Sequence, residues 1–361
     1  MEESVEVTKR TKKRRPSFGQ RLWRFVKRLL CFVLVTAVLL VGTLYGVMYI
    51  LAKGPSETAR DLFVMSVRET SAIGFLANLF FTDEEIAQIE KGKAPEAYAE
   101  TDTSLITISQ PEQNADGPVA DAWGLIDEDG DGIIIDPIKG PGYTGYMMVV
   151  LDPSRVIMGS VPESYYIRGY TVEEMVEHFD AVAGINAGGF VDPDGQGNGS
   201  IPDTLTVVDG KIYMGGIGNG FVGFDADHIM HVGCNNEQEI LDAGIQYGVC
   251  FGPVLIQNGE PCELEYHGGI NPRTAIGQRS DGAVLMLVID GRQVASIGAT
   301  YVDETEIMMR YGAVNACNLD GGSSSLMWFD GGYVNNCASV IGIRPVPTSF
   351  LVLKAGEGEN G

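Results

Sequence analysis

The sequence predicts an α+β fold, in which a mostly antiparallel or mixed β-sheet domain with a few helices follows one transmembrane helix and a short helical stalk. Three features of the 361 residues support this prediction: an uncharged apolar run near the N-terminus, a segment with apolar residues at helical spacing, and short β-branched runs separated by hairpin dipeptides. Because 45% of the residues are hydrophobic, the chain can bury a large core.

The first predicted element is a transmembrane helix at residues 29–51, a run of 23 residues without a charge. At ~1.5 Å per residue, such a helix spans a hydrocarbon core of about 30 Å. Residues 1–28 carry ten Lys or Arg and three Glu, so the positive-inside rule predicts a basic cytoplasmic tail and an extracellular C-terminal domain. A cleaved signal peptide is the alternative, but its apolar region would have only roughly 7–15 residues.

Residues 52–115 are predicted to form a helical stalk and linker. Thr82 and Glu85 form a capping box, and prolines interrupt residues 94–120. After residue 28 the chain has 15 basic and 45 acidic residues, and this acidity argues against a nucleic-acid partner. Cys250 and Cys262 flank a predicted hairpin and could pair, although the five cysteines outside the span cannot all pair with one another.

Residues 116–354 are predicted to form the β-rich domain, and residues 355–361 a flexible tail. The β-branched runs are 133–135, 146–151, 204–208, 284–289, 324–329 and 349–353. Dipeptides such as Asp209-Gly210 lie between them and are typical of hairpins. Two helices are expected: one that begins with a capping box at Thr171 and Glu174 and ends near Phe179, and one at residues 303–311.

Two predicted strands end in glycines beside polar side chains. Asn186 precedes Gly188 and Gly189, and the second strand is followed by a longer polar set: Asn318, Asp320, Gly321, Gly322, Ser323 and Ser324. Glycine lets a backbone approach a ligand closely, so these strand ends are candidate parts of a binding site. A tight turn with a capping aspartate is the alternative, and it is the commoner use of an Asp-Gly-Gly sequence.

A candidate anion-binding group lies between these two strand ends in the sequence. Arg273 follows Pro272, which restricts the local backbone, and precedes Thr274 and an apolar strand. A guanidinium offers paired donors and a permanent charge, which suit a phosphate. An ordinary salt bridge is the alternative in a chain with this many acids.

Three segments in this order resemble the phosphodiester glycosidase family: Asn-Ala-Gly-Gly-Phe (186–190), Pro-Arg-Thr-Ala-Ile-Gly (272–277) and Asn-Leu-Asp-Gly-Gly-Ser-Ser (318–324). The resemblance covers roughly residues 146–353 and includes Gly252-Pro253, Asp290-Gly291-Arg292 and Arg344. Ser323 departs from the pattern, because many members have a third glycine there. The short basic tail, single span and external domain are similar to bacterial cell-surface relatives.

The resemblance implies a hydrolase that cleaves the glycosidic bond of a sugar-1-phosphate diester in cell-surface or exopolysaccharide material. It suggests that Arg273 holds the phosphate, that Asp320 acts as nucleophile or as base for water, and that Asn186 orients the sugar or the water. The expected substrate-binding residues are Gly188, Gly189, Thr274, Asn318, Gly321, Gly322, Ser323, Ser324 and Arg344. No cofactor or metal is expected. The alternatives are a non-catalytic binder of anionic polysaccharide and a phosphodiesterase that cleaves the phosphorus–oxygen bond.

Three further features of the sequence are weaker indications of function. Asp127, Asp129 and Asp131 imitate the start of an EF-hand loop, but Ile138 stands where glutamate is expected, so a solvated turn is the preferred interpretation. The glycine-rich residues 192–199 either line the rim of a pocket or form a connector. Among the four histidines, His267 is the candidate closest in sequence to Arg273.

Overall fold

The computed structural model describes residues 17–70, 73–90, 97–109, 118–192, 197–214, 216–218, 220–264, 268–339 and 342–356. Most of the predicted basic tail (1–16), the end of the predicted flexible tail (357–361) and His267 lie outside the described residues. The chain forms two compact units, Met1–Ser56 and Glu57–Gly361. We describe each unit by itself.

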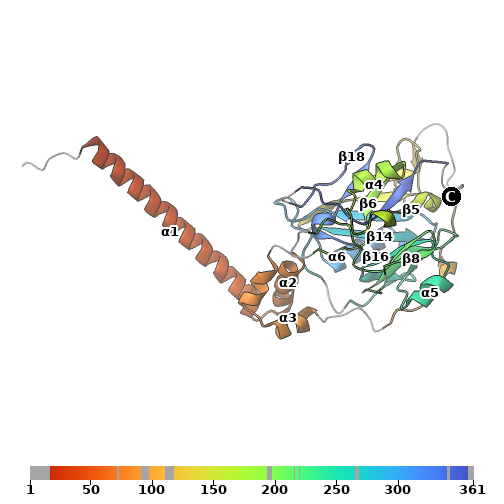
Figure 1. Ribbon diagram of the computed structural model, residues 1–361, viewed down its shortest axis with the longest axis horizontal. Coiled ribbons are helices and arrows are strands. Elements are labelled where there is room, and N and C mark those ends of the chain that lie inside the picture. Colours follow the sequence, from red (N-terminus) through yellow and green to blue (C-terminus); the bar gives the residue numbers. More distant parts are fainter. Residues whose placement is uncertain are drawn as a thin grey trace, which may run out of the picture. The chain divides into compact units, whose positions relative to one another are not determined.

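The described part of the first unit is dominated by one long helix, α1 (Phe18–Lys53) (Figure 1). Ser17 caps it, because its side chain accepts a hydrogen bond from the Gln20 N–H and the Gln20 side chain accepts one in return from the Ser17 N–H. The helix contains the predicted span 29–51 and is long and apolar enough to cross a membrane. It also extends back through the basic residues to Phe18, so it is longer than the apolar run that predicts it.

The second unit begins with helices α2 (Glu57–Arg68), η1 (Gly74–Leu79) and α3 (Asp83–Glu90). The predicted capping box of α3 is present: the Glu85 N–H donates to Thr82 Oγ1 and the Thr82 N–H donates to Glu85 Oε2. Val64, Ala77 and Ile86 are buried, so these helices pack their apolar face rather than expose it.

The described residues 97–109 run along the β-rich domain. The Thr107 N–H donates to the Ser280 carbonyl at 2.8 Å, and the side chain of Asn258 bonds to the backbone of residues 100 and 102 at 3.0 and 2.8 Å. The structure therefore begins its second unit at Glu57, whereas the sequence analysis placed residues 52–115 in a separate stalk and linker. Contacts between residues about 150 positions apart, which local sequence patterns do not report, account for this difference.

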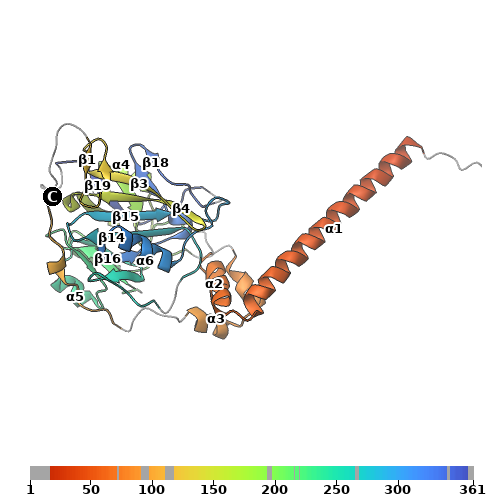
Figure 2. The ribbon, with the colours of Figure 1, turned by 180° about the vertical axis from the view of Figure 1, so that it is seen from behind.

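All the strand pairs of the described residues are antiparallel, which confirms the predicted α+β class. The largest sheet has the order β13-β12-β16-β14-β15-β4-β3. Its strands are β3 (Ile133–Gly140), β4 (Tyr143–Val150), β12 (Val254–Gln257), β13 (Glu260–Pro261), β14 (Arg273–Arg279), β15 (Val284–Ile289) and β16 (Ala313–Asn318). Figure 2 shows β15, β14 and β16 one below another, and β4 pairs with β15.

Two five-stranded sheets accompany it, with orders β18-β17-β6-β19-β5 and β10-β9-β11-β7-β8. The first contains β5 (Val156–Ser160), β6 (Ala181–Asn186), β17 (Met327–Phe329), β18 (Gly332–Tyr333) and β19 (Thr348–Leu353). The second contains β7 (Thr206–Val208), β8 (Lys211–Tyr213), β9 (Phe221–Phe224), β10 (Met230–Val232) and β11 (Tyr247–Cys250). A small ribbon pairs β1 (Val119–Ala120) with β2 (Ile126–Asp127).

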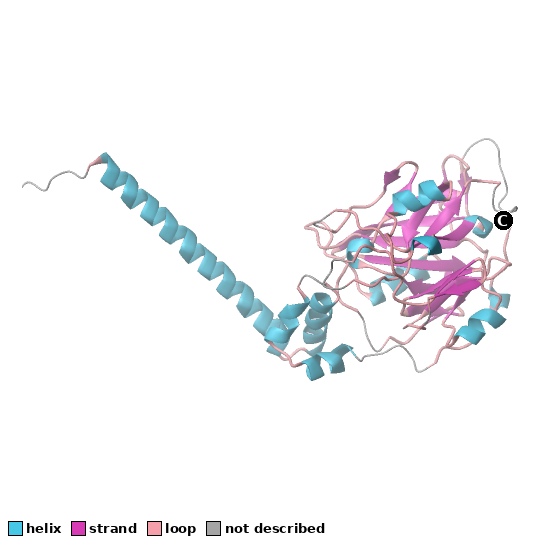
Figure 3. Cartoon of the chain, viewed as in Figure 1, coloured by secondary structure: helices cyan, strands magenta, loops and turns pink. Residues whose placement is uncertain are grey.

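The helices of the second unit are few and short, as Figure 3 shows. The main ones in the β-rich part are α4 (Val172–His178), α5 (Glu237–Asp242) and α6 (Tyr301–Arg310). Single 3₁₀ turns occur at η2 (Thr103–Leu105), η3 (Pro153–Arg155), η4 (Pro162–Ser164) and η6 (Gly322–Ser324). Thr171 and Glu174 form the predicted capping box of α4. Helix α6 begins at Tyr301 rather than Asp303, because Thr300 caps it.

Both faces of the large sheet are buried, and β15 shows how the sequence achieves this. Met286 and Val288 belong to the apolar cluster that the sheets share, whereas Leu285 and Leu287 belong to a second cluster with Ile307 and its neighbours on α6. Alternate residues of a strand point to opposite faces, so a continuous apolar run such as 284–289 fits a strand covered on both sides. All six cysteines are free, so Cys250 and Cys262 do not pair.

Candidate active site

The three segments that the sequence analysis singled out meet where two sheets come together. β14 begins beside the end of β16, since Ala275 pairs with Asn318, and the Leu319 N–H donates to the Thr274 carbonyl at 2.8 Å. β6 belongs to the other sheet, and the Asp320 N–H donates to the carbonyl of Ala187, just beyond its end, at 2.9 Å. The ends of β6 and β16 and the start of β14 therefore surround one place in the fold.

A pocket of about 270 Å³ opens at this place. Two of the three predicted catalytic residues, Asp320 and Arg273, line it. Six of the predicted substrate-binding residues also line it: Gly189, Gly321, Gly322, Ser323, Ser324 and Arg344. The part of residues 192–199 that the structure describes also reaches this pocket, because Asp192 lines it and binds Arg344.

The other predicted site residues lie behind the pocket wall. The buried Asn186 side chain joins three segments: its Nδ2 donates to the Asp320 carbonyl at 2.5 Å, while its Oδ1 accepts from Thr274 Oγ1 at 2.9 Å and from the Leu326 N–H at 3.1 Å. Asn318 Nδ2 donates to the Gly252 carbonyl at 2.6 Å, and the Gly188 N–H donates to Thr348 Oγ1 at 2.9 Å. These hydrogen bonds connect the strand ends that form the wall of the pocket.

Two of the acids that line the pocket, Asp320 and Asp203, have raised pKa values. The pKa of Asp320 is raised to about 7, mainly by burial and also by the nearby charge of Asp203, whereas a hydrogen bond from Ser324 opposes the change. Asp203 also lines the pocket, and desolvation raises its pKa. A Cβ on Gly189 would lie 2.8 Å from Asp203 Oδ2, so glycine at this position leaves room for the second carboxylate.

Three guanidinium groups line the same pocket, and two of them have carboxylate partners. Arg344 makes two parallel bonds to Asp192, at 2.8 and 2.7 Å, and lies 4.9 Å from the ring centre of Phe190. Arg273 donates to Glu69 Oε2 at 2.9 Å and stacks on Tyr301, 4.2 Å from the ring centre. Arg292 instead donates to neutral oxygens, Thr70 Oγ1 and Asn271 Oδ1.

A third acid, Glu304 of α6, lies fully buried near Arg273. Neither of its carboxylate oxygens has a hydrogen-bond partner. Burial raises its pKa to about 8, while the charge of Arg273 opposes the change. The carboxyl group is therefore mostly protonated at neutral pH.

The sequence analysis did not select several pocket residues. Glu69 lies in the segment predicted as a stalk, and no local pattern connects it with Arg273, about 200 positions away. Asp203 follows a single proline without a recognisable motif. Arg292 was noted only within Asp290-Gly291-Arg292 as part of the family resemblance and was not selected as a site residue, although that signal could have identified it.

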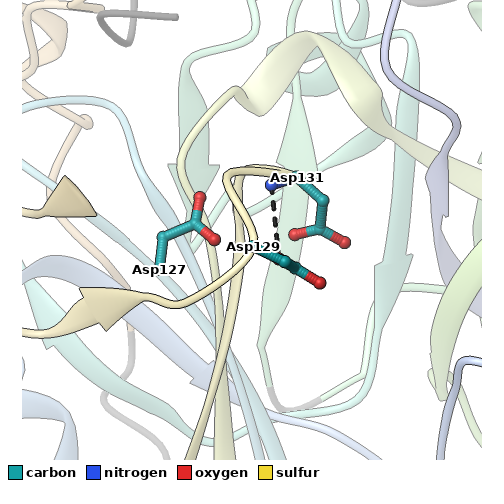
Figure 4. Close-up of side chains that lie close together, drawn as sticks. All are labelled: Asp127, Asp129 and Asp131. Carbon is teal, nitrogen blue, oxygen red and sulfur yellow. Dashed lines mark hydrogen bonds between the residues drawn. The ribbon is translucent and has the colours of Figure 1, made fainter. Parts of the chain in front are cut away.

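Asp127, Asp129 and Asp131 do not line this pocket, and their loop precedes β3 (Figure 4). Asp127 accepts the N–H groups of Gly130 and Gly132, both at 2.9 Å, and Asp131 accepts that of Ile133 at 2.7 Å. The carboxylate oxygens come within 4.8 Å of one another. Their hydrogen bonds to the local backbone are those of a tight turn, which agrees with the preferred interpretation of this sequence.

Comparison with known proteins agrees with the motif resemblance. Residues 179–353 match the sequence profile of the family described as phosphodiester glycosidase. Over these residues the chain is a phosphodiester glycosidase domain by sequence. The match includes all the residues that line the pocket except Glu69.

The chain matches only part of the length of its curated relatives. The prophage-derived uncharacterized protein YomE of Bacillus subtilis (strain 168) is 32% identical over 204 residues, which cover 53% of this chain and 30% of that protein. The N-acetylglucosamine-1-phosphodiester alpha-N-acetylglucosaminidase of Bos taurus is 26% identical over 183 residues, or 45% of this chain and 34% of that enzyme. The chain thus spans about a third of the length of these relatives.

A solved structure has the same fold. The catalytic domain of the zebrafish N-acetylglucosamine-1-phosphodiester alpha-N-acetylglucosaminidase, described as auto-inhibited by its pro-peptide, superimposes with a TM-score of 0.51 at 22% identity. The match covers 62% of this chain and 82% of that chain. Family membership supports a hydrolase of the phosphodiester glycosidase kind.

Proposed function

We propose that this protein is a membrane-anchored hydrolase that cleaves the glycosidic bond of a sugar-1-phosphate diester, such as an N-acetylglucosamine-1-phosphodiester, outside the cell. The main support is the pocket itself, where Asp320, with a pKa of about 7, faces the same space as three guanidinium groups. A carboxylate next to cationic groups suits a substrate that joins a sugar carbon to a phosphate.

The proposed reaction breaks the bond between the anomeric carbon and the phosphate oxygen. The phosphate monoester leaves as a stable anion with the bonding electron pair, so a strong general acid is not required, and the guanidinium groups stabilise its charge. Asp320 either attacks the anomeric carbon to form a glycosyl ester, which water then hydrolyses, or takes a proton from the attacking water. Asp203 is a second carboxylate for the oxocarbenium-like transition state.

Residues behind the wall have positioning roles in this proposal. Asn186 binds the Asp320 carbonyl and so fixes the backbone that carries the carboxylate. Thr274 and Asn318 hold the neighbouring strand ends, and the glycines at 188, 189, 321 and 322 let the walls approach the ligand.

The anchoring and location follow from the N-terminal part of the chain. Helix α1 has the length and apolar composition of a membrane span, and the ten basic residues of the tail place the N-terminus in the cytoplasm under the positive-inside rule. The domain then faces the outside, where phosphate-containing glycopolymers of the cell surface or exopolysaccharide are the available substrates.

The first prediction concerns Asp320. Asp320→Asn keeps the side-chain shape but removes the charge that attacks carbon or water, so kcat is expected to fall by at least about a hundredfold. The assay uses the full chain in detergent, the methyl phosphodiester of α-N-acetylglucosamine-1-phosphate, and release of reducing sugar. For the wild type, kcat/KM is expected to rise with pH through about 7, because the carboxyl group must lose its proton.

Asp129→Asn, in the exposed turn, is the matched control and is expected to leave kcat unchanged. Hydrolysis in heavy-oxygen water is expected to label the sugar hydroxyl. Label in the phosphate instead indicates phosphorus–oxygen cleavage, and binding of the diester without turnover indicates a polysaccharide-binding protein.

A further inference from the structure

We propose that Arg292 binds the phosphate of the substrate, and that segment 66–70, which ends helix α2, assembles this subsite by fixing Arg273 through Glu69. This inference rests on the proposed function, since it assigns the phosphate to one side of the pocket. Segment 66–70 follows the candidate membrane helix in the sequence and precedes the family match at residue 179. The family resemblance therefore does not predict its role.

Segment 66–70, the end of α2 and the turn that follows it, holds loop 268–271. Ser66 Oγ accepts the Ile270 N–H at 2.9 Å, and Glu69 Oε1 accepts the Gly269 N–H at 3.0 Å. The Glu69 N–H still donates to the Met65 carbonyl at 2.9 Å, so the turn continues the helical spacing and Ser66, Glu69 and Thr70 all reach the loop. A Cβ on Gly269 would lie 2.5 Å from the Ser66 nitrogen, so the two backbones are in close contact.

Glu69 neutralises Arg273, which is only 4% exposed. The guanidinium Nη2 donates to Glu69 Oε2 at 2.9 Å and to the Gly269 carbonyl at 2.5 Å, and its Nε donates to the Ala299 carbonyl at 3.1 Å. The same Glu69 oxygen accepts from Asn271 Nδ2 at 2.7 Å. Arg273 is thus a buried cation with its anion already in place, and that anion also orients Asn271.

Arg292 lies exposed in the same pocket with neutral partners. Its Nη2 donates to Thr70 Oγ1 at 2.9 Å and to Asn271 Oδ1 at 3.1 Å. In the described ranges of the chain, the ion pairs of the pocket involve Arg273 and Arg344 and do not include Arg292. A guanidinium with its remaining donors directed to a pocket is suited to a phosphate, which accepts paired hydrogen bonds.

The position of Arg292 also matches the proposed chemistry. A Cβ on Gly322 would lie 3.1 Å from Arg292 Nη2, so the guanidinium packs against the backbone that follows Asp320. A phosphate bound there lies next to the loop of the proposed nucleophile. Thr70 and Asn271 fix the guanidinium from the other side, and both depend on segment 66–70 for their position.

A competing interpretation is that Glu69 occupies the place of the phosphate on Arg273. The two interpretations predict opposite effects of removing the carboxylate. If Glu69 positions Arg273 and Asn271, then its loss disorders the subsite and weakens catalysis. If Glu69 occupies the subsite, then its loss exposes Arg273 and strengthens substrate binding.

The experiment compares kcat, KM and inhibition by inorganic phosphate for the full chain in detergent, with the methyl phosphodiester of α-N-acetylglucosamine-1-phosphate. Arg292→Lys is expected to raise KM and the phosphate inhibition constant at least about tenfold with little change in kcat, because lysine lacks the paired donors. Arg310→Lys, an exposed arginine of α6, is the control. Unchanged KM and phosphate inhibition in Arg292→Lys overturn the assignment.

Glu69→Ala is expected to lower kcat/KM at least about tenfold, and added acetate is expected to restore part of the loss, because it can bind between Arg273 and Asn271. Asp61→Ala, which removes a carboxylate from the same helix, is the control. A merely structural role of Glu69 does not predict acetate rescue. Higher activity of Glu69→Ala, or its inhibition by acetate, overturns the positioning role.

Failure of this inference can be told apart from failure of the proposed function. If the wild-type chain does not hydrolyse the diester, the proposed hydrolysis is wrong. Calorimetric binding of inorganic phosphate then still tests the subsite: at least about tenfold weaker binding to Arg292→Lys supports it, and equal binding overturns it.

Discussion

Glu304 shows how the environment of a single side chain sets its charge. It is fully buried near Arg273, and its two carboxylate oxygens have no hydrogen-bond partner. An ionised carboxylate without hydrogen-bond partners is unfavourable in a buried environment. Burial therefore raises the pKa of Glu304 to about 8. Arg273 therefore has one ionised partner, Glu69, and one acid that is mostly neutral at pH 7.

This arrangement predicts the pH dependence of stability. Because the folded-state pKa of Glu304 is higher than its ordinary value, its stabilising contribution is complete below about pH 4 and is lost as the pH rises towards 8. The difference in unfolding free energy between Glu304→Gln and the wild type is expected to shift by a few kcal/mol in favour of the variant from pH 5 to pH 8. Urea unfolding at both pH values measures it.

The exposed Glu306 of the same helix supplies the control. Glu306→Gln makes the same substitution at a side chain that is exposed to solvent. It is therefore expected to change the free energy of unfolding by a similarly small amount at pH 5 and at pH 8. Equal differences at pH 5 and pH 8 for Glu304→Gln contradict a buried protonated acid.

At the scale of elements, the site depends on how strand ends from two sheets are joined. The Asn186 side chain connects β6 with β14 and with the loop that follows β16. The bonds to Thr274 and Leu326 are buried and the bond to the Asp320 carbonyl is partly buried, so losing the amide leaves polar groups without partners. Such a group costs about 1–3 kcal/mol.

Asn186→Ala is therefore expected to lower the free energy of unfolding by about 2–4 kcal/mol, and to lower kcat as the Asp320 backbone loses its anchor. Thermal unfolding and diester hydrolysis measure the two effects. Asn78→Ala, which removes an exposed amide that binds Asp83, is the control. Loss of kcat without loss of stability is evidence that Asn186 touches the substrate directly.

Local patterns predicted much of the element list and part of the site. The continuous apolar run at residues 284–289 and the capping boxes at Thr82 and Thr171 predicted β15, α3 and α4, because each depends on neighbours in the sequence. The short strands β9 and β10 and helix α5 were not predicted, since runs of three to six residues carry little periodicity. The motif order predicted the convergence of residues around Arg273 and Asp320, but not the arrival of Glu69.

At the scale of the whole molecule, the folded unit includes residues that resemble a linker in sequence. Val64, Ala77, Ile86 and Ile106 are buried in the second unit. Fully burying one Val or Ile side chain contributes ~1.5–3 kcal/mol. Removing several of them therefore lowers the free energy of unfolding of the unit considerably. The segment before the family match is therefore a structural part of the domain.

A soluble fragment of residues 57–361 is expected to unfold cooperatively and to hydrolyse the diester. A fragment of residues 116–361 is expected to melt at a temperature lower by at least about 5 °C, because each kcal/mol corresponds to roughly 2–4 °C in domains of 150–250 residues and several are lost. Differential scanning calorimetry measures both fragments. Equal melting temperatures contradict the boundary at Glu57.

The last strand of the chain has a consequence for biosynthesis. β19 (Thr348–Leu353) lies between β5 and β6 and pairs with both. Until residue 353 has been synthesised, these two earlier strands each present an open edge, and open edges invite pairing with other chains. Translation must therefore be almost complete before this sheet can close.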